Sequence, residues 1–147
     1  MPGLGLSRIE GAAPGDLASA LEAAGLPPVS VSSATTVYQF VGTAGPIGWA
    51  ALEICDKAAL LRSVVVAEGH RGTGVGAAMV RAVIRQARDD GMKELWLLTE
   101  TGRGFFARQG FALVDRASAP AAIRNTSEFA AICPRSADCM TMRLSAQ

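Results

Sequence analysis

Histidine, tyrosine, cysteine and long apolar runs are all scarce in this sequence. His70 is the only histidine. Tyr38 is the only tyrosine, and we expect it on an edge-like strand without a catalytic role. No apolar segment approaches the ~20 residues that a membrane-spanning helix needs. The opening residues, MPGLGLSRIEG, contain no basic stretch followed by an apolar run, so we expect no signal peptide. Three cysteines, an odd number, argue against a secreted disulfide scaffold and favour a reducing, cytoplasmic location.

The chain also has almost no excess of positive or negative charge, since its 147 residues carry a formal net charge of only +1. That value gives no reason to expect nucleic acid or an anionic membrane as a partner. Half of the residues are hydrophobic and 18% are charged, which excludes a disordered or fibrous chain. We therefore expect one globular domain over residues 1–147, of ordinary size and with a real core.

The most informative stretch is LRSVVVAEGHRGTGVGA, residues 61–77. Val64, Val65 and Val66 form a short apolar run that predicts a strand buried on both faces. Glycines follow at positions 72, 74 and 76, and a long helical pattern begins near Val75. Glycines let a ligand approach the backbone, and the first N–H groups of a helix are unpaired, so this turn predicts an anion site.

Two well-known glycine motifs do not fit this turn. A Walker loop ends in Gly-Lys-Ser/Thr, and no lysine occurs between Lys57 and Lys93. The dinucleotide fingerprint G-x-G-x-x-G has a different spacing. Residues 71–76, RGTGVG, instead match R-x-x-G-x-G. Together with the preceding apolar strand, this pattern resembles the acetyl-CoA pyrophosphate loop of the Gcn5-related N-acetyltransferase (GNAT) superfamily.

The order of predicted elements covers nearly the whole chain. We expect strands over residues 6–9, 36–41, 47–55, 60–66, 94–99, 113–115 and 139–144. We expect helices over residues 17–24, 74–90 and 102–109, and a short helical segment between 119 and 132. The resemblance implies the α/β (α+β type) GNAT fold: a mixed, mostly antiparallel sheet of six to seven strands, splayed between strands 4 and 5 and flanked by helices.

The resemblance also implies how acetyl-CoA is held. The main chain of Val64–Val66 would pair with the pantetheine arm. The N–H groups from Arg71 to Ala77 would hold the pyrophosphate, which makes Arg71, Gly72, Thr73, Gly74, Val75, Gly76 and Ala77 cofactor-binding residues. The family pattern Asn-x-x-Ala-x-x-x-Tyr-x-x-x-Gly-Phe, aligned on Gly110-Phe111, places Phe106 where relatives carry a tyrosine that protonates the departing thiolate. Phe106 is then a cofactor contact that has no proton to donate.

Glu53 and Arg62 are the next candidates, because a hairpin turn at Lys57-Ala58 would place them directly opposite each other. They could form a simple cross-strand salt bridge. Alternatively, Arg62 binds a substrate carboxylate, and Glu53 positions it or relays the proton of the amine. Arg62 shares strand parity with Val64 and Val66. The arginines at positions 81, 85 and 88, by contrast, lie on one side of a helix and indicate a solvated face.

The C-terminal region narrows the resemblance to one branch of the superfamily. The segments LLTET…FFARQGF and PAAIRNTSEF…CPRSA…M resemble amino-acid N-acetyltransferases associated with arsenic resistance. This resemblance implies that Thr99, Thr101, Arg124 and Ser136 bind the substrate, with Arg124 as a second carboxylate or oxyanion clamp. The alternative is a capped loop that braces the last strand. Cys133 and Cys139 lack a zinc spacing, so we expect no metal.

The leading hypothesis is therefore a cytoplasmic enzyme that acetylates the amino group of a small amino acid by direct attack on acetyl-CoA. Glutamate or an analogue such as arsinothricin or phosphinothricin is the expected acceptor. An N-acetylglutamate synthase of arginine biosynthesis, a non-catalytic acetyl-CoA binder or metalloid sensor, and a protein or peptide N-terminal acetyltransferase remain alternatives. A homodimer remains open.

Overall fold

The computed structural model describes residues 5–9, 35–42, 45–67, 74–126, 129 and 137–144. Its strands are β1 (Gly5–Ile9), β2 (Thr35–Gly42), β3 (Gly45–Cys55), β4 (Ala58–Val66), β5 (Glu94–Thr99), β6 (Ala112–Val114) and β7 (Asp138–Arg143). The helices are α2 (Val75–Asp89), α3 (Arg103–Arg108), the 3-10 turn η1 (Arg116–Ser118) and α4 (Ala121–Arg124). Each described strand and helix α2 and α3 begins and ends within two residues of the prediction. The helix expected over 17–24 lies outside the described residues.

The strands pair in the order β1-β2-β3-β4-β5-β7-β6. β1, β2 and β3 form an antiparallel meander, and β5, β7 and β6 are antiparallel as well. β4 and β5 are the parallel pair, with Ala58–Leu60 aligned against Glu94–Trp96. The mixed, mostly antiparallel α/β fold is thus confirmed, while the expected splaying of strands 4 and 5 stays a prediction.

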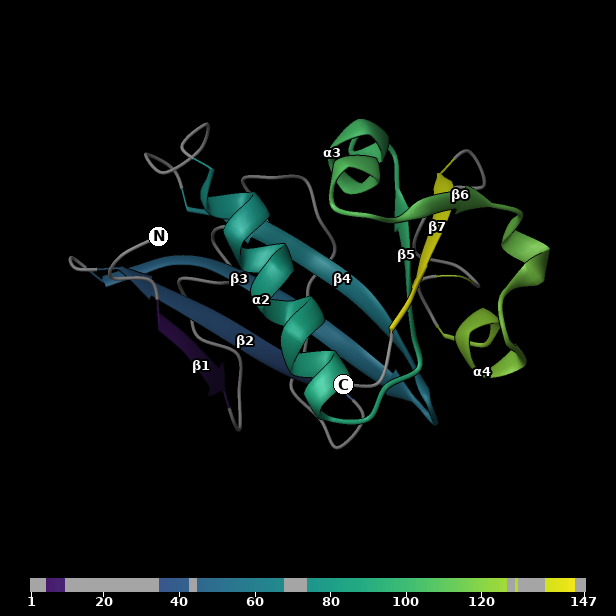
Figure 1. The fold of residues 1–147 in the computed structure, drawn as a ribbon, viewed down its shortest axis with the longest axis horizontal. Coiled ribbons are helices and arrows are strands. Elements are labelled where there is room, and N and C mark those ends of the chain that lie inside the picture. The colour runs from purple at the N-terminus through teal and green to yellow at the C-terminus, as the bar shows by residue number, and fades with distance from the viewer. Residues whose placement is uncertain are drawn as a thin grey trace. The chain divides into compact units, whose positions relative to one another are not determined.

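Contacts divide the chain into two compact parts. The first contains β1, β2, β3 up to Glu53, the end of β4 from Arg62, and α2 up to Val83. Here α2 lies against one face of the strands (Figure 1). Gly48 on β3 permits this packing, since a Cβ there would overlap the sulfur of Met79 and come within 3.0 Å of the Val65 carbonyl oxygen. Met79 belongs to α2, and its side chain is completely buried.

The sequence of α2 explains which of its sides packs. The apolar rows at i, i+4 are all buried, namely Val75, Met79, Val83, Val80, Ile84 and Ala87. Arg81 and Arg85 are exposed as predicted, but Arg88 is half-buried, so the expected solvated row holds for only two of its three arginines.

Within the described residues, no helix combines the length and apolar character needed to span a membrane.

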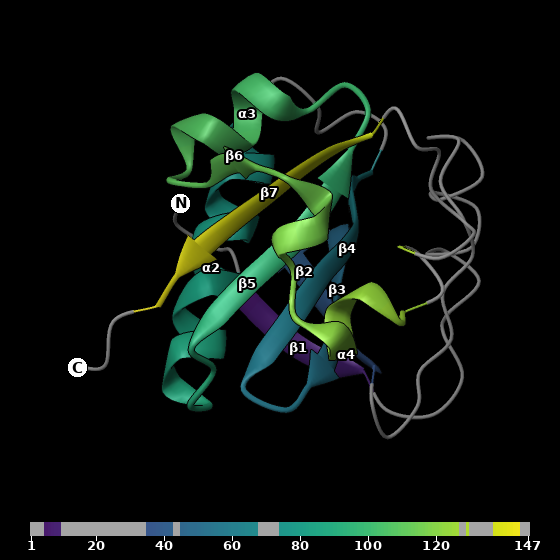
Figure 2. The same cartoon turned by 90° about the vertical axis from the view of Figure 1, so that its right-hand side faces the viewer.

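The second part contains the tip of the β3–β4 hairpin from Ile54 to Leu61, and the chain from Ile84 onwards. β7 runs between β5 and β6, and α3 and α4 belong to this part (Figure 2). One core cluster joins the hairpin tip, the strands and α4; it comprises Ala58, Leu60, Trp96, Leu98, Ala119, Ile123, Ala137 and Cys139. This cluster anchors the short α4, which has too few residues to be stable alone.

Two details of the meander differ from the prediction. Tyr38 was expected on an edge-like strand, but β2 lies between β1 and β3, and Tyr38 is only 2% exposed. The hairpin turn consists of Asp56 and Lys57, one residue earlier than assumed. In a regular hairpin with this turn, Glu53 and Arg62 are diagonal neighbours on one face rather than directly opposed residues.

Candidate active site

Of the predicted phosphate loop, the described residues include only the part from Gly74 onwards. β4 ends at Val66, and α2 begins at Val75 directly after Gly74. Gly74 is exposed and has a φ of +84°, which glycine adopts without strain. The first bond of this turn runs from the Ala78 N–H to the Gly74 carbonyl, over 3.2 Å.

The N–H groups of the next three residues, Val75, Gly76 and Ala77, have no acceptor within the helix. The first turn of α2 carries no acidic residue. The positive end of the helix dipole and these three N–H groups therefore meet no competing carboxylate from the first turn of α2 itself. Arg71, Gly72 and Thr73, which were expected to complete the loop, lie outside the described residues.

The valines of β4 differ in burial. Val65 is 4% exposed, whereas Val64 and Val66 are half-buried. Ser63 just before them has a φ of +60°, a left-handed conformation that no regular strand residue adopts. The two-residue alternation assumed between Arg62 and Val64 therefore cannot be carried through Ser63.

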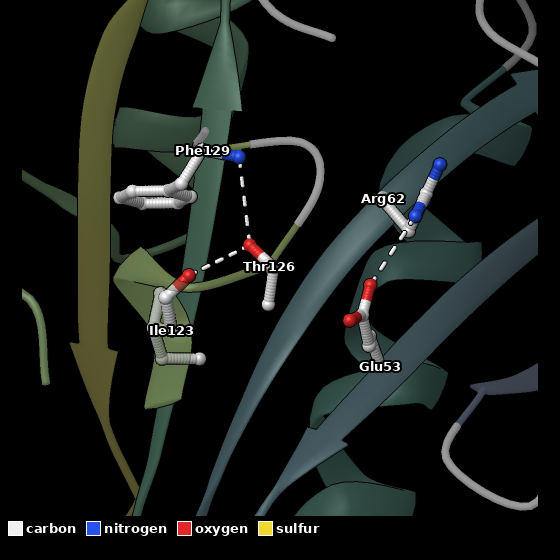
Figure 3. A network of polar contacts seen from close by, with 5 residues as sticks. All are labelled: Glu53, Arg62, Ile123, Thr126 and Phe129. Atoms are coloured by element: carbon white, nitrogen blue, oxygen red, sulfur yellow. Dashed lines mark hydrogen bonds and ion pairs between the residues drawn. The ribbon is translucent and has the colours of Figure 1, made fainter. Parts of the chain in front are cut away.

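Glu53 and Arg62 form the ion pair that the sequence predicted. The Arg62 Nη1 lies 3.2 Å from the Glu53 Oε1 (Figure 3). The side chains are 8% and 20% exposed, so the pair is largely shielded from water. Thr35 of β2 is the direct strand partner of Glu53 and is also buried. Since Gly48 faces α2, the alternation along β3 places Glu53 on the opposite face of the strands.

Phe106 lies in a compact aromatic group on α3. Its ring meets Phe105 edge to face at 5.0 Å and Phe111 at 5.8 Å between centroids. A Schellman motif at the end of α3 fixes this arrangement. The Phe111 N–H donates to the Phe106 carbonyl oxygen, and the Gly110 N–H donates to the Ala107 carbonyl oxygen. Gly110 has the positive φ, +105°, that this motif requires. Phe106 is half-buried and offers an apolar surface without a hydroxyl group.

Thr99 ends β5 beside this aromatic group. Its Oγ1 accepts a hydrogen bond of 2.9 Å from the Gly102 N–H, so the hydroxyl oxygen shapes the entry into α3. A Cβ on Gly102 would lie 2.8 Å from the Thr99 Oγ1 and 3.1 Å from the Phe106 ring. Only glycine fits there without a shift. Thr101, the other threonine expected at the substrate, is exposed.

Arg124 is the last residue of α4, and its guanidinium is tethered at one end. Its Nε donates a 2.9 Å hydrogen bond to the Ala119 carbonyl oxygen. The residue is exposed, and among the described residues its two terminal nitrogens have no partner. An anchored guanidinium with a free edge suits a carboxylate, which accepts two parallel N–H bonds.

Of the three cysteines, the described residues include Cys55, which is half-buried, and Cys139. Cys139 is 3% exposed and lies in the core cluster of the second part. Burial raises the pKa of its thiol to about 11, although Arg116 lowers it and Asp115 adds to the rise. The thiol is therefore protonated and unreactive at neutral pH. No group of three metal-ligating side chains occurs among the described residues. Cys133 and Ser136 lie outside them.

Sequence reasoning missed the side chains that hold the segment after α4. The Thr126 hydroxyl donates to the Ile123 carbonyl oxygen at 2.6 Å and accepts from the Phe129 N–H at 3.4 Å. Arg116 stacks over the Phe129 ring, 5.5 Å from its centroid, and donates to the Phe129 carbonyl oxygen. A threonine just beyond a short helix was the available signal, since its hydroxyl often bonds a nearby carbonyl.

Comparisons with known proteins bear on the family and on the fold of this chain. The model of the acetyltransferase (GNAT) family matches residues 31–111. Among curated protein sequences none matches significantly. Many solved structures match; the first is the N-acetylglutamate synthase of Neisseria gonorrhoeae complexed with coenzyme A and N-acetyl-glutamate, at 19% identity and a TM-score of 0.72. That match covers 95% of this chain but only 35% of the synthase chain, so this chain spans about a third of its length.

Two further solved structures are similar over nearly their full length. The ribosomal-protein-S18-alanine N-acetyltransferase of Escherichia coli has 16% identity and a TM-score of 0.70, covering 98% of this chain and 96% of that one. The IAA acetyltransferase of Bacillus cereus has 19% identity and a TM-score of 0.67, covering 96% and 99%. At these identities the likeness establishes the fold alone.

Proposed function

The chain belongs to the acetyltransferase (GNAT) family, and from this membership we propose that it transfers the acetyl group of acetyl-CoA to the amino group of a small amino acid. Bound acetyl-CoA would supply that acetyl group as a thioester. Glutamate, or an analogue that carries an arsenic or phosphorus acid, is the acceptor we propose. The resemblance of the C-terminal segments to acetyltransferases associated with arsenic resistance supports this choice.

The junction between β4 and α2 carries the proposal. Gly74 is exposed at positive φ, and a Cβ at this position would meet no atom of the described residues within 4 Å. The first turn of α2 carries no acidic side chain. These properties fit a pyrophosphate. In our proposal the main-chain N–H groups of Gly74–Ala77 bind it together with Arg71, Gly72 and Thr73, and the main chain of Val64–Val66 holds the pantetheine arm.

The chain's own side chains have three tasks. Arg62 binds the α-carboxylate of the acceptor, and Glu53 holds the Arg62 guanidinium in place through the ion pair at 3.2 Å. Arg124 binds a second acid group with its free edge. Thr99, Thr101 and Ser136 are neutral donors near the acceptor. The alternative role of Glu53 is to take the proton of the amine, and the kinetics of a Glu53 variant distinguish the two roles.

The proposal is tested by thiol release from acetyl-CoA across a panel of free amino acids, with glutamate, arsinothricin and phosphinothricin included. We expect turnover with at least one acidic amino acid. Acetylation of peptide N-termini but of no free amino acid would indicate a protein acetyltransferase instead. Tight acetyl-CoA binding without turnover would indicate a non-catalytic binder or sensor.

Phe106→Tyr is expected to be tolerated without a loss of kcat. The side chain is half-buried, so a hydroxyl group at its tip does not have to enter the core. The family pattern that this segment resembles also has tyrosine at this position. The matched control is Phe111→Tyr, which places the same hydroxyl on a ring only 3% exposed and should lower the thermal midpoint. A large fall in kcat for Phe106→Tyr, with acetyl-CoA affinity retained, would show that the reaction depends on the apolar ring.

A further inference from the structure

We infer that Thr126 is a positioning residue that sets the guanidinium of Arg124 for an acceptor with a second acid group. The inference rests on the proposed amino-acid acetylation and adds a residue to its substrate site. Thr126 is 5% exposed, yet its hydroxyl makes two hydrogen bonds. Buried hydroxyl groups that are fully bonded hold a particular backbone conformation.

The bonds of Thr126 close the end of the helix that carries Arg124. The Ile123 carbonyl oxygen accepts from the Thr126 hydroxyl group at 2.6 Å (Figure 3). It also accepts from the Thr126 N–H at 3.1 Å. The same hydroxyl oxygen accepts from the Phe129 N–H and so ties the following segment to this helix end. Arg124 lies between Ile123 and Thr126, so the backbone on its C-terminal side is held by this hydroxyl group.

A helix of four residues does not hold its shape by itself, because helix nucleation is unfavourable. Two side chains hold α4 instead. Ile123 is completely buried in the core cluster, and Thr126 closes the C-terminal end. The direction in which Arg124 leaves the helix therefore depends on both of them.

Arg124 is tethered on its other side as well. Its Nε donates to the Ala119 carbonyl oxygen, which precedes α4. Ala119 is buried in the same core cluster. With the Nε held and the helix end closed, the two terminal nitrogens keep one orientation, and no described residue occupies them. A planar, pre-oriented fork selects a carboxylate or a similar oxyanion over a neutral amide.

The test compares L-glutamate with L-glutamine, which differ only in the charge and the donor pattern of the side-chain end. Thr126→Val keeps the shape and removes both hydroxyl bonds. We expect it to raise KM for glutamate about tenfold, with kcat, KM for glutamine and KM for acetyl-CoA unchanged. Thr126→Ser, which keeps the hydroxyl group, should restore KM for glutamate to within about twofold.

A double-mutant cycle separates positioning from a general structural role. In an Arg124→Ala background, Thr126→Val should change KM for glutamate by less than about twofold, because its effect acts through Arg124. Equal losses for glutamate and glutamine, or the same loss with and without Arg124, would overturn the inference. If Thr126→Val folds poorly, the ratio of kcat/KM for glutamate to kcat/KM for glutamine still tests the inference. Both constants are measured on one preparation, so the folded fraction cancels in their ratio.

The outcomes also distinguish this inference from the proposed function. Acetylation of neutral amino acids in preference to acidic ones by the wild-type protein would refute the role of Thr126 and Arg124 while leaving the acetyltransferase assignment intact. Absence of acetylation for every amino acid would refute the proposed acceptor class itself.

Discussion

Gly76→Asp is expected to abolish the rise in thermal midpoint that acetyl-CoA gives to the wild-type protein. A ligand that binds only the folded state stabilises it by about 2.7 kcal/mol at a hundredfold excess over Kd. For a chain of this size, each kcal/mol corresponds to about 2–4 °C. Gly76 lies in the first turn of α2, so a carboxylate there would repel the pyrophosphate that we place at this turn.

The same substitution should not destabilise the protein without ligand through its charge. The first turn of α2 has no acidic residue, and a carboxylate near a helix N-terminus is normally favourable. The neutral isostere Gly76→Asn is the matched control, and it should keep more of the ligand-induced shift. Gly74→Val is a poorer test, since the φ of +84° at this position would strain a β-branched residue. Wild-type acetyl-CoA affinity of Gly76→Asp by calorimetry would refute the proposed phosphate site.

Arg62→Lys and Arg124→Lys should each raise KM for the best acidic acceptor about tenfold to a hundredfold, which corresponds to about 1.5–3 kcal/mol for hydrogen bonds to charged groups. Lysine keeps the charge but cannot form two parallel bonds with a carboxylate. Acetyl-CoA affinity should not change. The conservative change matters most at position 62, because Arg62→Ala would leave Glu53 in a shielded site without this partner, at a cost of about 3–5 kcal/mol of stability.

The matched control for both variants is Arg85→Lys, since Arg85 is exposed on α2 and has no part in the proposed site. It should leave every kinetic constant unchanged. If both Arg62→Lys and Arg124→Lys keep kcat/KM within twofold of the wild type, the two arginines bind no substrate acid. Arg62 would then be half of a structural ion pair, and Arg124 a surface charge.

Glu53→Gln separates the two roles considered for this carboxylate. A residue that positions Arg62 affects binding of the acceptor, so its loss raises KM while kcat persists. A residue that takes the proton of the amine affects the chemical step, so its loss lowers kcat and removes a step from the pH–rate profile. The ion pair at 3.2 Å favours the positioning role.

Local sequence patterns predicted most of the described architecture. Alternating and continuous apolar runs identified the strands, and the i, i+4 rows of α2 identified its buried side. Gly110 predicted the end of α3, where a positive φ closes a Schellman motif. These features depend on residues close in sequence, which is why they can be predicted from the chain alone.

Other features depend on contacts between residues far apart in sequence. That β2 is an inner strand, which buries Tyr38, follows from its pairing with β1. The left-handed Ser63 interrupts β4, although serine carries no signal for that conformation. The partial burial of Arg88 likewise reflects packing that helical periodicity does not describe.

The candidate site shows the same division. The glycine spacing after β4, the pairing of Glu53 with Arg62 and the choice of Arg124 were all available from the sequence by itself. Only the tertiary structure decided how each arginine is used. Arg62 is shielded and engaged with Glu53, while Arg124 is exposed and tethered to Ala119, and no described residue bonds its terminal nitrogens. The physical reason is that the arginine side chain itself determines that a guanidinium binds carboxylates and similar anions. Packing then determines how deeply the guanidinium is buried and which carbonyl groups lie beside it, and so which N–H groups remain for a ligand.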